Sequence, residues 1–188
     1  MTSALTHAIG IDDAPFRPGW RGDVELIGAV CSGPRLDGVL RTRVRRDGAN
    51  ATERIAAMIE CSRYREHLHL VLLQGIAVAG FNVVDIRGLS GRLGLPVVAV
   101  ARKVPDLDAV RRALLTRVPG GARKWRLIER AGPPQAAAGV WLQCAGIGLG
   151  LAAEAVARLA VHGRIPEPLR LAHLIAGGLS GLPTRQRV

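Results

Sequence analysis

Four carboxylates stand at the ends of expected secondary-structure elements, where α/β proteins carry their functional side chains. They are Asp12 and Asp13 after a first apolar strand, Glu53 in the first turn of a helix, and Asp85 after the strand at 69–73. Carboxylate oxygens are the ligands that Mg²⁺ prefers, and a metal held in this way activates water for phosphodiester hydrolysis. We hypothesise that the four acids converge on a site for Mg²⁺, or alternatively Mn²⁺.

Each acid also has a structural role open to it. Asp12 and Asp13 can cap a turn, and Asp85 can stabilise the first turn of a helix through the helix dipole. Glu53 stands three residues after Asn50, which is the spacing of a capping box. Spacing alone does not separate the structural roles from the metal site, so both interpretations stay open.

Three further patterns are weaker candidates. His67 and His69 lie on one side of a strand start, where solvation is a simpler explanation than a metal site with only two ligands. His173 stands in the apolar helix LRLAHLIAGG, which favours a partly buried histidine with a satisfied hydrogen bond over a catalytic one. The segment 148–153 fits the dinucleotide pattern G-x-G-x-x-A, but the required β-α-β unit is incomplete.

The charge of the chain indicates a polyanionic partner. The net charge is +11 and the isoelectric point is near 11.3, so DNA or another nucleic acid is the expected partner. A GC-biased genome would also produce such an arginine-rich chain. The candidate phosphate-binding residues are Arg41, Arg43 and Arg45 on one face of a strand, and Arg123 and Lys124 within the basic segment 111–130. Trp125 could stack on a base, although a place on the buried face of its helix is the better interpretation.

The bulk composition predicts one domain over residues 1–188. The chain is 48% hydrophobic but only 3% aromatic, which indicates a core of aliphatic residues. Its three cysteines are far apart and lack a C-x-x-C motif, so we expect neither a disulfide framework nor a thiolate zinc site. The N-terminus does not resemble a signal peptide, and prolines and glycines interrupt the uncharged run at 131–153, so we expect a cytoplasmic protein without a membrane span.

The order of the expected elements predicts an α/β fold. A strand at 7–11 precedes a hairpin at 24–44, and a helix at 50–64 leads to the strand at 69–73. The later elements are a helix at 82–94, a strand at 95–101, helices at 105–118 and 122–131, a strand at 140–144, and helices from about 149 and 168. This order predicts a mixed sheet with an antiparallel start and helices on both faces.

Six segments resemble, in the same order, a largely archaeal family described as endonuclease dU. They are IGIDDAPF, LDGVLRTRV, DGANATERIAAMI, QGIAVAGFNVVDI, GLPVVAVARK and IPEPLRLAHLIAGG. That family is similar to endonuclease V. The resemblance implies an RNase H-like fold, dependence on magnesium, and cleavage of DNA near a deaminated base, with deoxyuridine the suggested target.

The resemblance to endonuclease V also implies roles for particular residues. Asp12 matches the acid on the first strand of that family, and Glu53 is the counterpart of its glutamate. Lys103 matches a lysine that closes a later strand and can contact a phosphate oxygen. Asn82 or Asp85 falls near a polar position after the central strand, and Asn82 is also a candidate contact for nucleic acid.

Gln74 is the main departure from that family. Endonuclease V ends its central strand with a metal-binding aspartate followed by glycine, whereas this chain has Gln74 followed by Gly75. An amide oxygen can bind Mg²⁺ but brings no charge, so the ion is held less strongly. Asp85, Asp13 or Asp47 could restore the charge, the enzyme could be slow, or the chain could bind nucleic acid without cutting it.

Two functions from different classes follow. The first is a metal-dependent endonuclease in which Asp12, Glu53, Gln74, Asp85 and Lys103 form the catalytic site. The alternative is a non-catalytic nucleic-acid-binding protein of the same fold. The segment 165–178 carries much of the resemblance to endonuclease dU, but the comparison with endonuclease V gives it no role.

Overall fold

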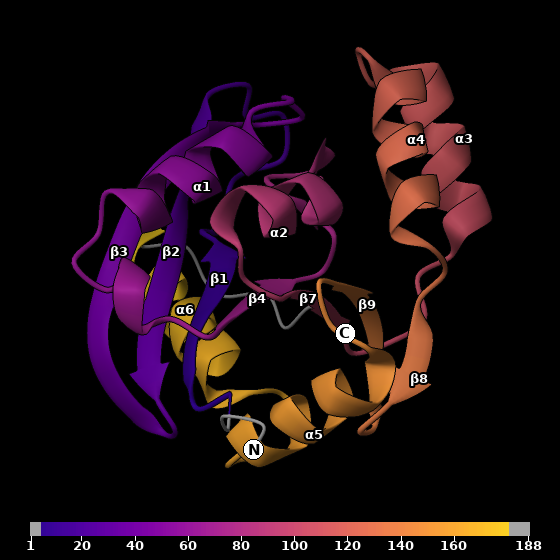
Figure 1. Cartoon of the computed structure of the whole chain (residues 1–188). Coiled ribbons are helices and arrows are strands. Elements are labelled where there is room, and N and C mark those ends of the chain that lie inside the picture. Colours follow the sequence, from indigo (N-terminus) through magenta and orange to yellow (C-terminus); the bar gives the residue numbers. More distant parts are fainter. Residues whose placement is uncertain (1–4, 181–188) are drawn as a thin grey trace.

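The core of the protein is a seven-stranded mixed sheet with helices on both faces (Figure 1). The computed structural model describes residues 5–180. Residues 1–4 and 181–188 of the predicted domain lie outside the described part. The strands of this sheet are β1 (His7–Asp13), β2 (Asp23–Ser32), β3 (Arg35–Arg45), β4 (Leu70–Gln74), β7 (Val97–Ala101), β8 (Gln135–Ala137) and β9 (Val140–Ala145). A separate two-stranded ribbon consists of β5 (Ala77–Val78) and β6 (Asn82–Val83).

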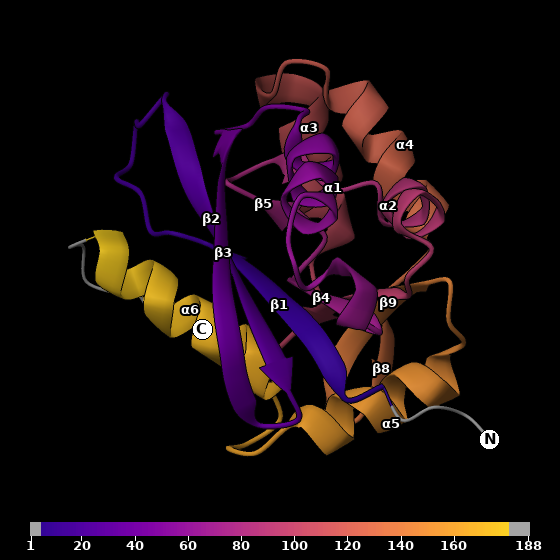
Figure 2. The ribbon, with the colours of Figure 1, turned by 60° about the vertical axis from the view of Figure 1, so that its left-hand side comes forward.

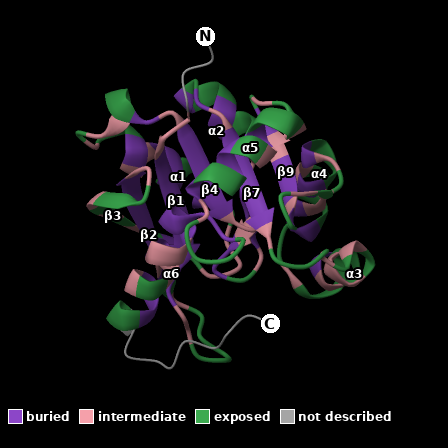
Figure 3. Cartoon of the chain, turned by 90° about the horizontal axis from the view of Figure 1, so that it is seen from below, coloured by how far each residue is buried: buried purple, intermediate pink, exposed green. Residues whose placement is uncertain are grey.

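The helices form two layers around the sheet. They are α1 (Ala51–Glu60), the 3₁₀ turn η1 (Arg65–His67), α2 (Ile86–Leu93), α3 (Leu107–Arg117), α4 (Gly121–Ala131), α5 (Leu149–Leu159) and α6 (Glu167–Ser180). Figure 2 shows α1 and α2 on one side of the sheet and α5 and α6 on the other. The antiparallel pair α3 and α4 stands beside the sheet, and α3 is largely exposed (Figure 3).

The strand order brings three parallel strand ends to one edge. The order across the sheet is β3-β2-β1-β4-β7-β9-β8, in which β1, β4 and β7 are parallel and the outer neighbours are antiparallel. Ile11 on β1 lies opposite Leu73 on β4, and Gln74 lies opposite Val100 on β7. The residues that follow, including Asp12, therefore gather at the carboxyl edge of this parallel core.

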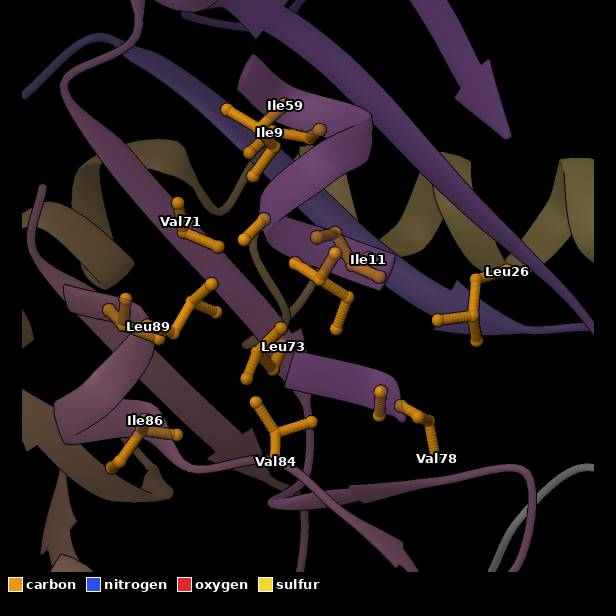
Figure 4. Packing of buried hydrophobic residues seen from close by; sticks show 14 of the residues in the cluster. Ile9, Ile11, Leu26, Ile59, Val71, Leu73, Val78, Val84, Ile86 and Leu89 are labelled. Atoms are coloured by element: carbon orange, nitrogen blue, oxygen red, sulfur yellow. The ribbon is translucent and has the colours of Figure 1, made fainter. Parts of the chain in front are cut away.

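Side chains alternate between two hydrophobic layers along these strands. Ile9, Ile11, Val71 and Leu73 pack against α1 and α2 (Figure 4). Their neighbours in sequence, such as Ala8 and the pair at 70 and 72, pack against α5 and the start of α6. The central strands β1, β4 and β7 are buried on both faces (Figure 3), which explains why β4 and β7 are almost wholly aliphatic.

The structure confirms the mixed sheet with an antiparallel start, but several predicted elements have different bounds. The hairpin of β2 and β3 is longer than predicted and turns through Gly33 and Pro34 alone. The helix predicted at 82–94 begins only at Ile86, because Asn82 and Val83 form β6 and Asp85 caps the helix. The short strands β5, β6 and β8 were not predicted, since two or three residues are too few for a periodic pattern.

Within residues 5–180, none of the helices combines the length and the apolar character that crossing a bilayer would need. The uncharged run at 131–153 folds as the end of α4, the strands β8 and β9, and the start of α5. All three cysteines are free.

A glycine in β1 lets α6 lie directly on the sheet. A Cβ atom added at Gly10 would stand 2.2 Å from the carbonyl carbon of Pro168 and 2.4 Å from the amide nitrogen of Leu169. Both are backbone atoms of the first turn of α6, so a rotamer change in a neighbouring side chain cannot relieve the clash. Only glycine permits this separation between strand and helix.

We expect Gly10→Ala to destabilise the fold by about 2–3 kcal/mol, because α6 must shift away from β1 to make room for the methyl group. Equilibrium unfolding in urea would measure the change. Gly91→Ala is the matched control, since it adds the same methyl group within α2 with nothing within 4 Å of the new Cβ. This control should be neutral or stabilising by about 1 kcal/mol. Equal unfolding midpoints for the two variants would contradict the role assigned to Gly10.

Candidate active site

Asp12 and His173 are in direct contact at the carboxyl edge of the parallel strands. Asp12 Oδ2 lies 2.7 Å from His173 Nδ1, although the two residues are 161 positions apart. The other carboxylate oxygen, Oδ1, accepts a hydrogen bond of 2.9 Å from the backbone N–H of Asp13. The Asp12 side chain is only 3% exposed and that of His173 is 31% exposed. Solvent therefore reaches the pair mainly through the imidazole.

The packing of α6 determines where His173 lies. Leu169, Ala172 and Ala176 are fully buried and form one stripe of the helix. His173 adjoins this stripe, so its ring is directed toward β1 rather than away from it. The sequence predicted a partly buried histidine with a hydrogen-bond partner, and this prediction is confirmed. The identity of the partner, Asp12, was not predicted, because the two residues meet only when α6 packs on β1.

Gln74 lies beside Asp12 on the same face of the sheet. Leu70 and Leu72 face the α5 and α6 layer, and the alternation places Gln74 on that side as well. Since Ile11 pairs with Leu73, the next residues on the two strands are neighbours across a strand spacing of roughly 5 Å. Gln74 is partly exposed. The amide therefore joins the Asp12–His173 pair at the carboxyl edge of the sheet.

Asp13 points to the opposite face from Asp12. Its Oδ2 atom accepts a hydrogen bond of 3.0 Å from the backbone N–H of Ala79, and the residue is 5% exposed. Ala79 has a positive φ of 48° and follows β5. Asp13 thus anchors the turn between β5 and β6 to the end of β1. Consecutive residues of a strand face opposite ways, which explains why the two acids do not share one site.

Glu53 is not brought together with Asp12. It lies on the exposed side of α1, where its Oε2 accepts a hydrogen bond of 2.7 Å from Arg92 Nη1. Arg92 also binds Glu60, with nitrogen–oxygen distances of 2.8 and 2.6 Å, and this hydrogen bond lowers the pKa of the Glu60 carboxyl. Helix α1 covers the other face of the sheet, so Glu53 serves to join α1 to α2 in this structure.

Asp85 has the structural role that the sequence left open. Its Oδ1 accepts a hydrogen bond of 3.0 Å from the backbone N–H of Gly88, which caps the start of α2. Oδ2 lies 3.5 Å from Arg130 Nη1 of α4. The capping box predicted for α1 is wrong, because Asn50 makes no side-chain cap and Asn82 Oδ1 accepts the N–H of Ala51 instead.

Two predicted nucleic-acid contacts are buried. Asn82 is 0% exposed, and its amide nitrogen donates to the carbonyl of Arg45 and to Asn50 Oδ1, each at 2.9 Å. Lys124 is 3% exposed and donates to the backbone carbonyl of Asp47. Burial lowers the pKa of this ammonium. Both side chains connect segments of the fold, so neither is available to a surface phosphate.

The other predicted basic residues are exposed. Arg41, Arg43 and Arg45 alternate along the outer strand β3, as the sequence predicted. Arg43 Nε lies 2.5 Å from Glu25 Oε1 and Arg45 Nη1 lies 3.8 Å from Asp23 Oδ1, so part of this charge is already compensated. Lys103 follows β7, and Arg123 lies on α4; both are exposed.

Trp125 is partly buried between α3 and α4, which confirms the predicted place on the buried face of its helix. Its Nε1 atom donates to Glu129 Oε1 at 2.7 Å, and the guanidinium of Arg111 lies 5.7 Å from the ring centroid. Arg111 thus occupies one face of the ring, which leaves less of it for stacking on a base.

The donor set at the carboxyl edge has one carboxylate. Within residues 5–180, no three histidine, cysteine, aspartate or glutamate side chains are grouped closely enough to hold a metal ion by themselves. The Asp12–His173 pair matches the carboxylate–histidine arrangement that orients metal-binding imidazoles, and Gln74 adds an amide oxygen. A mixed nitrogen and oxygen set fits Mn²⁺ at least as well as Mg²⁺, provided that water or substrate oxygens complete the coordination.

Sequence relatives cover nearly the whole chain. Residues 4–180 match the model of the endonuclease dU family. A UPF0215 protein of Deinococcus radiodurans is 57% identical over 185 residues, which cover 98% of this chain and 94% of that protein. A UPF0215 protein of Methanothermobacter thermautotrophicus is 48% identical and covers 92% of this chain and 86% of its own length.

Solved structures share the fold. A protein of unknown function from Archaeoglobus fulgidus has a TM-score of 0.86 at 30% identity, covering 92% of this chain and 97% of that one. Endonuclease V of Bacillus subtilis gives a TM-score of 0.58 at 15% identity, with coverages of 94% and 81%. Endonuclease V of Ciona intestinalis, in complex with a 24mer DNA containing an inosine, gives 0.60 at 13%, with coverages of 93% and 85%. The prediction of an endonuclease V-like, RNase H-like fold is confirmed.

An ion pair at the start of α6 gives a testable dependence of stability on pH. Arg170 binds Glu167 through nitrogen–oxygen pairs of 2.8 and 2.5 Å, which holds the pKa of the buried Glu167 carboxyl below its ordinary value of 4.5. Because the pKa of this carboxyl is lower in the folded than in the unfolded protein, its ionised form stabilises the fold. This stabilisation is present above pH 4.5 and is lost as the pH falls through the folded-state pKa.

We therefore expect Glu167→Gln to destabilise the protein by about 1–3 kcal/mol at pH 7 and by less at pH 3. Urea unfolding of both proteins at the two pH values would measure this difference. Glu154→Gln on α5 is the control, because Glu154 is exposed and should change little at either pH. A destabilisation by Glu167→Gln that is equal at both pH values would contradict the assignment.

Proposed function

This chain belongs to the endonuclease dU family, as its six sequence segments predicted, and we propose that it is a metal-dependent endonuclease acting on DNA that contains deaminated bases. Deoxyuridine is the suggested target. The observation that carries the proposal is the 2.7 Å pair of Asp12 and His173 at the carboxyl edge of the parallel strands, with Gln74 beside it. This edge is where α/β folds bind their ligands.

Asp12, His173 and Gln74 are the residues that would hold Mg²⁺ or Mn²⁺. The ion, when bound, supplies Lewis-acid stabilisation of the phosphate and an activated water. Asp12 contributes the negative charge. Gln74 would contribute a neutral oxygen, so the protein would provide less charge than a site with two carboxylates, and oxygens of the substrate phosphates would supply further negative charge.

The Asp12–His173 pair also orients the imidazole for metal binding. Because Asp12 binds Nδ1, it fixes the orientation of the ring, so Nε2 is the nitrogen that would bind the ion. The Asp12 carboxylate also makes the imidazole a more basic ligand. Burial of Asp12 behind the ring keeps this pair intact while the ring remains in contact with solvent.

The basic surface supports contact with DNA. Lys103 lies just beyond β7, at the edge that holds Asp12, and is the candidate for a phosphate near the reacting bond. Arg41, Arg43 and Arg45 on β3 and Arg123 on the projecting pair α3 and α4 are candidates for more distant phosphates (Figure 1). Such contacts position a duplex but do not read its sequence.

A second function keeps the fold and the partner but omits catalysis. It is favoured by Gln74, which is neutral, and by Glu53 and Asp85, which are engaged in contacts away from Asp12. A protein of this kind would bind nucleic acid with strong salt dependence and without any requirement for a metal. The two functions differ in whether Asp12 is needed for turnover.

We expect Asp12→Asn and His173→Ala each to lower the rate of nicking of a deoxyuridine-containing duplex by about 100-fold or more, because each removes half of the pair. The assay is single-turnover cleavage with Mn²⁺ and with Mg²⁺, and circular dichroism would verify that each variant is folded. Glu53→Gln is the matched control, since Glu53 lies on the opposite layer and should retain nearly full activity. Nicking that is absent in the wild type, or unchanged in Asp12→Asn, would favour the second function.

Gln74→Asp tests whether the missing charge limits the enzyme. A carboxylate next to Asp12 strengthens the attraction for a divalent ion, so the metal concentration for half-maximal activity should fall by about tenfold. A titration of Mn²⁺ against the cleavage rate would measure it. Gln135→Asp would serve as a control for added charge, because Gln135 is exposed on the edge strand β8, three strands away from β4. A higher metal requirement in Gln74→Asp would exclude Gln74 from the metal site.

A further inference from the structure

A basic cavity of about 340 Å³ shares helix α6 with the candidate active site and is not used by the proposed chemistry. Its walls come from the residue after β7, the turn between β8 and β9, the loop from α5 to α6, and the first turn of α6. Val140 and Ile165 are buried and form an apolar part of the lining. The volume is that of a pocket for a small organic group rather than for a single ion.

The cationic side chains of the cavity come from separate segments. They are Arg102, His162, Arg164 and Arg170. Among the described residues, no aspartate or glutamate lines the cavity, and the nearby Glu167 is engaged by Arg170. Arg102 and Arg164 are exposed and make no ion pair within residues 5–180. Two uncompensated guanidiniums in one cavity favour an anionic occupant.

The position of Arg164 is built into the fold. Its side chain lies against Gly139 in the turn between β8 and β9, where an added Cβ would stand 2.8 Å from Arg164 Cδ. Gly139 has a φ of 73°, so glycine is also the residue that this turn conformation favours. The close approach of the two segments places the arginine at the wall of the cavity.

The cavity faces the same layer as Asp12. Val98 and Val100 of β7 pack toward α5, and the alternation continues to Arg102. Arg170 precedes His173 by three residues, and side chains at this spacing are neighbours on a helix. Two strand spacings separate β1 from β7, which is roughly 10 Å. This separation corresponds to about three nucleotides at a rise of roughly 3.4 Å.

We propose that this cavity binds a backbone phosphate, with its nucleoside, of the DNA strand that is cut, about one to three nucleotides from the reacting bond. The inference rests on the proposed function. Arginine forks match phosphate oxygens, and the apolar lining accommodates a sugar or the edge of a base. The occupant is part of a strand rather than a free nucleotide, because Arg170 of the cavity stands three residues before His173 on the same face of α6.

The test is a binding measurement that does not depend on cleavage. Arg102→Ala combined with Arg164→Ala should weaken binding of a deoxyuridine-containing duplex, in EDTA, by about tenfold. It should also reduce the slope of log K against log salt by about 1, the value for one phosphate. Arg54→Ala combined with Arg87→Ala removes the same charge from exposed positions on α1 and α2 and is the matched control. Equal losses in the two double variants would overturn the proposal.

Neutral methylphosphonate linkages locate the phosphate. Replacement of one linkage at a time should weaken binding to the wild type at one or two adjacent positions near the deoxyuridine. At those positions the Arg102/Arg164 double variant should show no additional loss, while the control variant should lose affinity as the wild type does. Additive losses at every linkage, or a free deoxynucleoside 5′-monophosphate that binds as tightly as the duplex, would overturn the assignment to a strand.

These outcomes are separate from those of the cleavage test. A wild type that binds the duplex but does not nick it would contradict the proposed nuclease activity, while the phosphate site in the cavity could still be mapped in EDTA. If the wild type nicks the duplex and the cavity variant binds it as tightly as the control variant, only the proposed role of the cavity would be contradicted. Absence of duplex binding by the wild type would overturn the cavity inference directly.

Discussion

The contact between Gly10 and the first turn of α6 determines the rest of the candidate site. The backbone of Pro168 and Leu169 lies against the strand at a distance that excludes even a methyl group. The buried stripe of Leu169, Ala172 and Ala176 then continues this contact along β1 and β2. Since His173 adjoins the stripe, its ring meets Asp12 where β1 ends. The same helix start presents Arg170 to the basic cavity.

The alternation of side chains along the strands explains why this site contains only one carboxylate. Asp12 and Gln74 face the α6 layer, whereas Asp13 faces the layer of α1 and α2. Glu53 and Asp85 belong to that second layer, where Arg92 and the start of α2 engage them. Acids that are neighbours along the chain, or at the ends of adjacent elements, are thus separated by the thickness of the sheet.

The sequence predicted the fold better than the site. Long apolar strands and capped helices carry a local signal, so β1, β4, β7 and α6 were located within a few residues. The partner of His173 was not predictable, because 161 positions separate it from Asp12 and only tertiary packing joins them. Asn82 and Lys124 were predicted to contact nucleic acid, Asn82 from the family resemblance and Lys124 from its basic segment, yet each is buried where it binds backbone carbonyls. Polarity alone does not distinguish a buried connector from a surface ligand.

In the proposed endonuclease, a site with a single carboxylate would make metal binding and DNA binding depend on each other. If the substrate phosphates supply the charge that Gln74 lacks, the ion binds more tightly when DNA is present, and linkage requires that DNA also binds more tightly with the ion. The basic cavity would favour the same DNA-bound state, since the guanidinium groups of Arg102 and Arg164 attract the strand whose phosphates lie at the metal site. Without DNA, those positive charges oppose a divalent ion. The proposed site would therefore favour binding of the metal ion and the substrate together over binding of the metal ion alone.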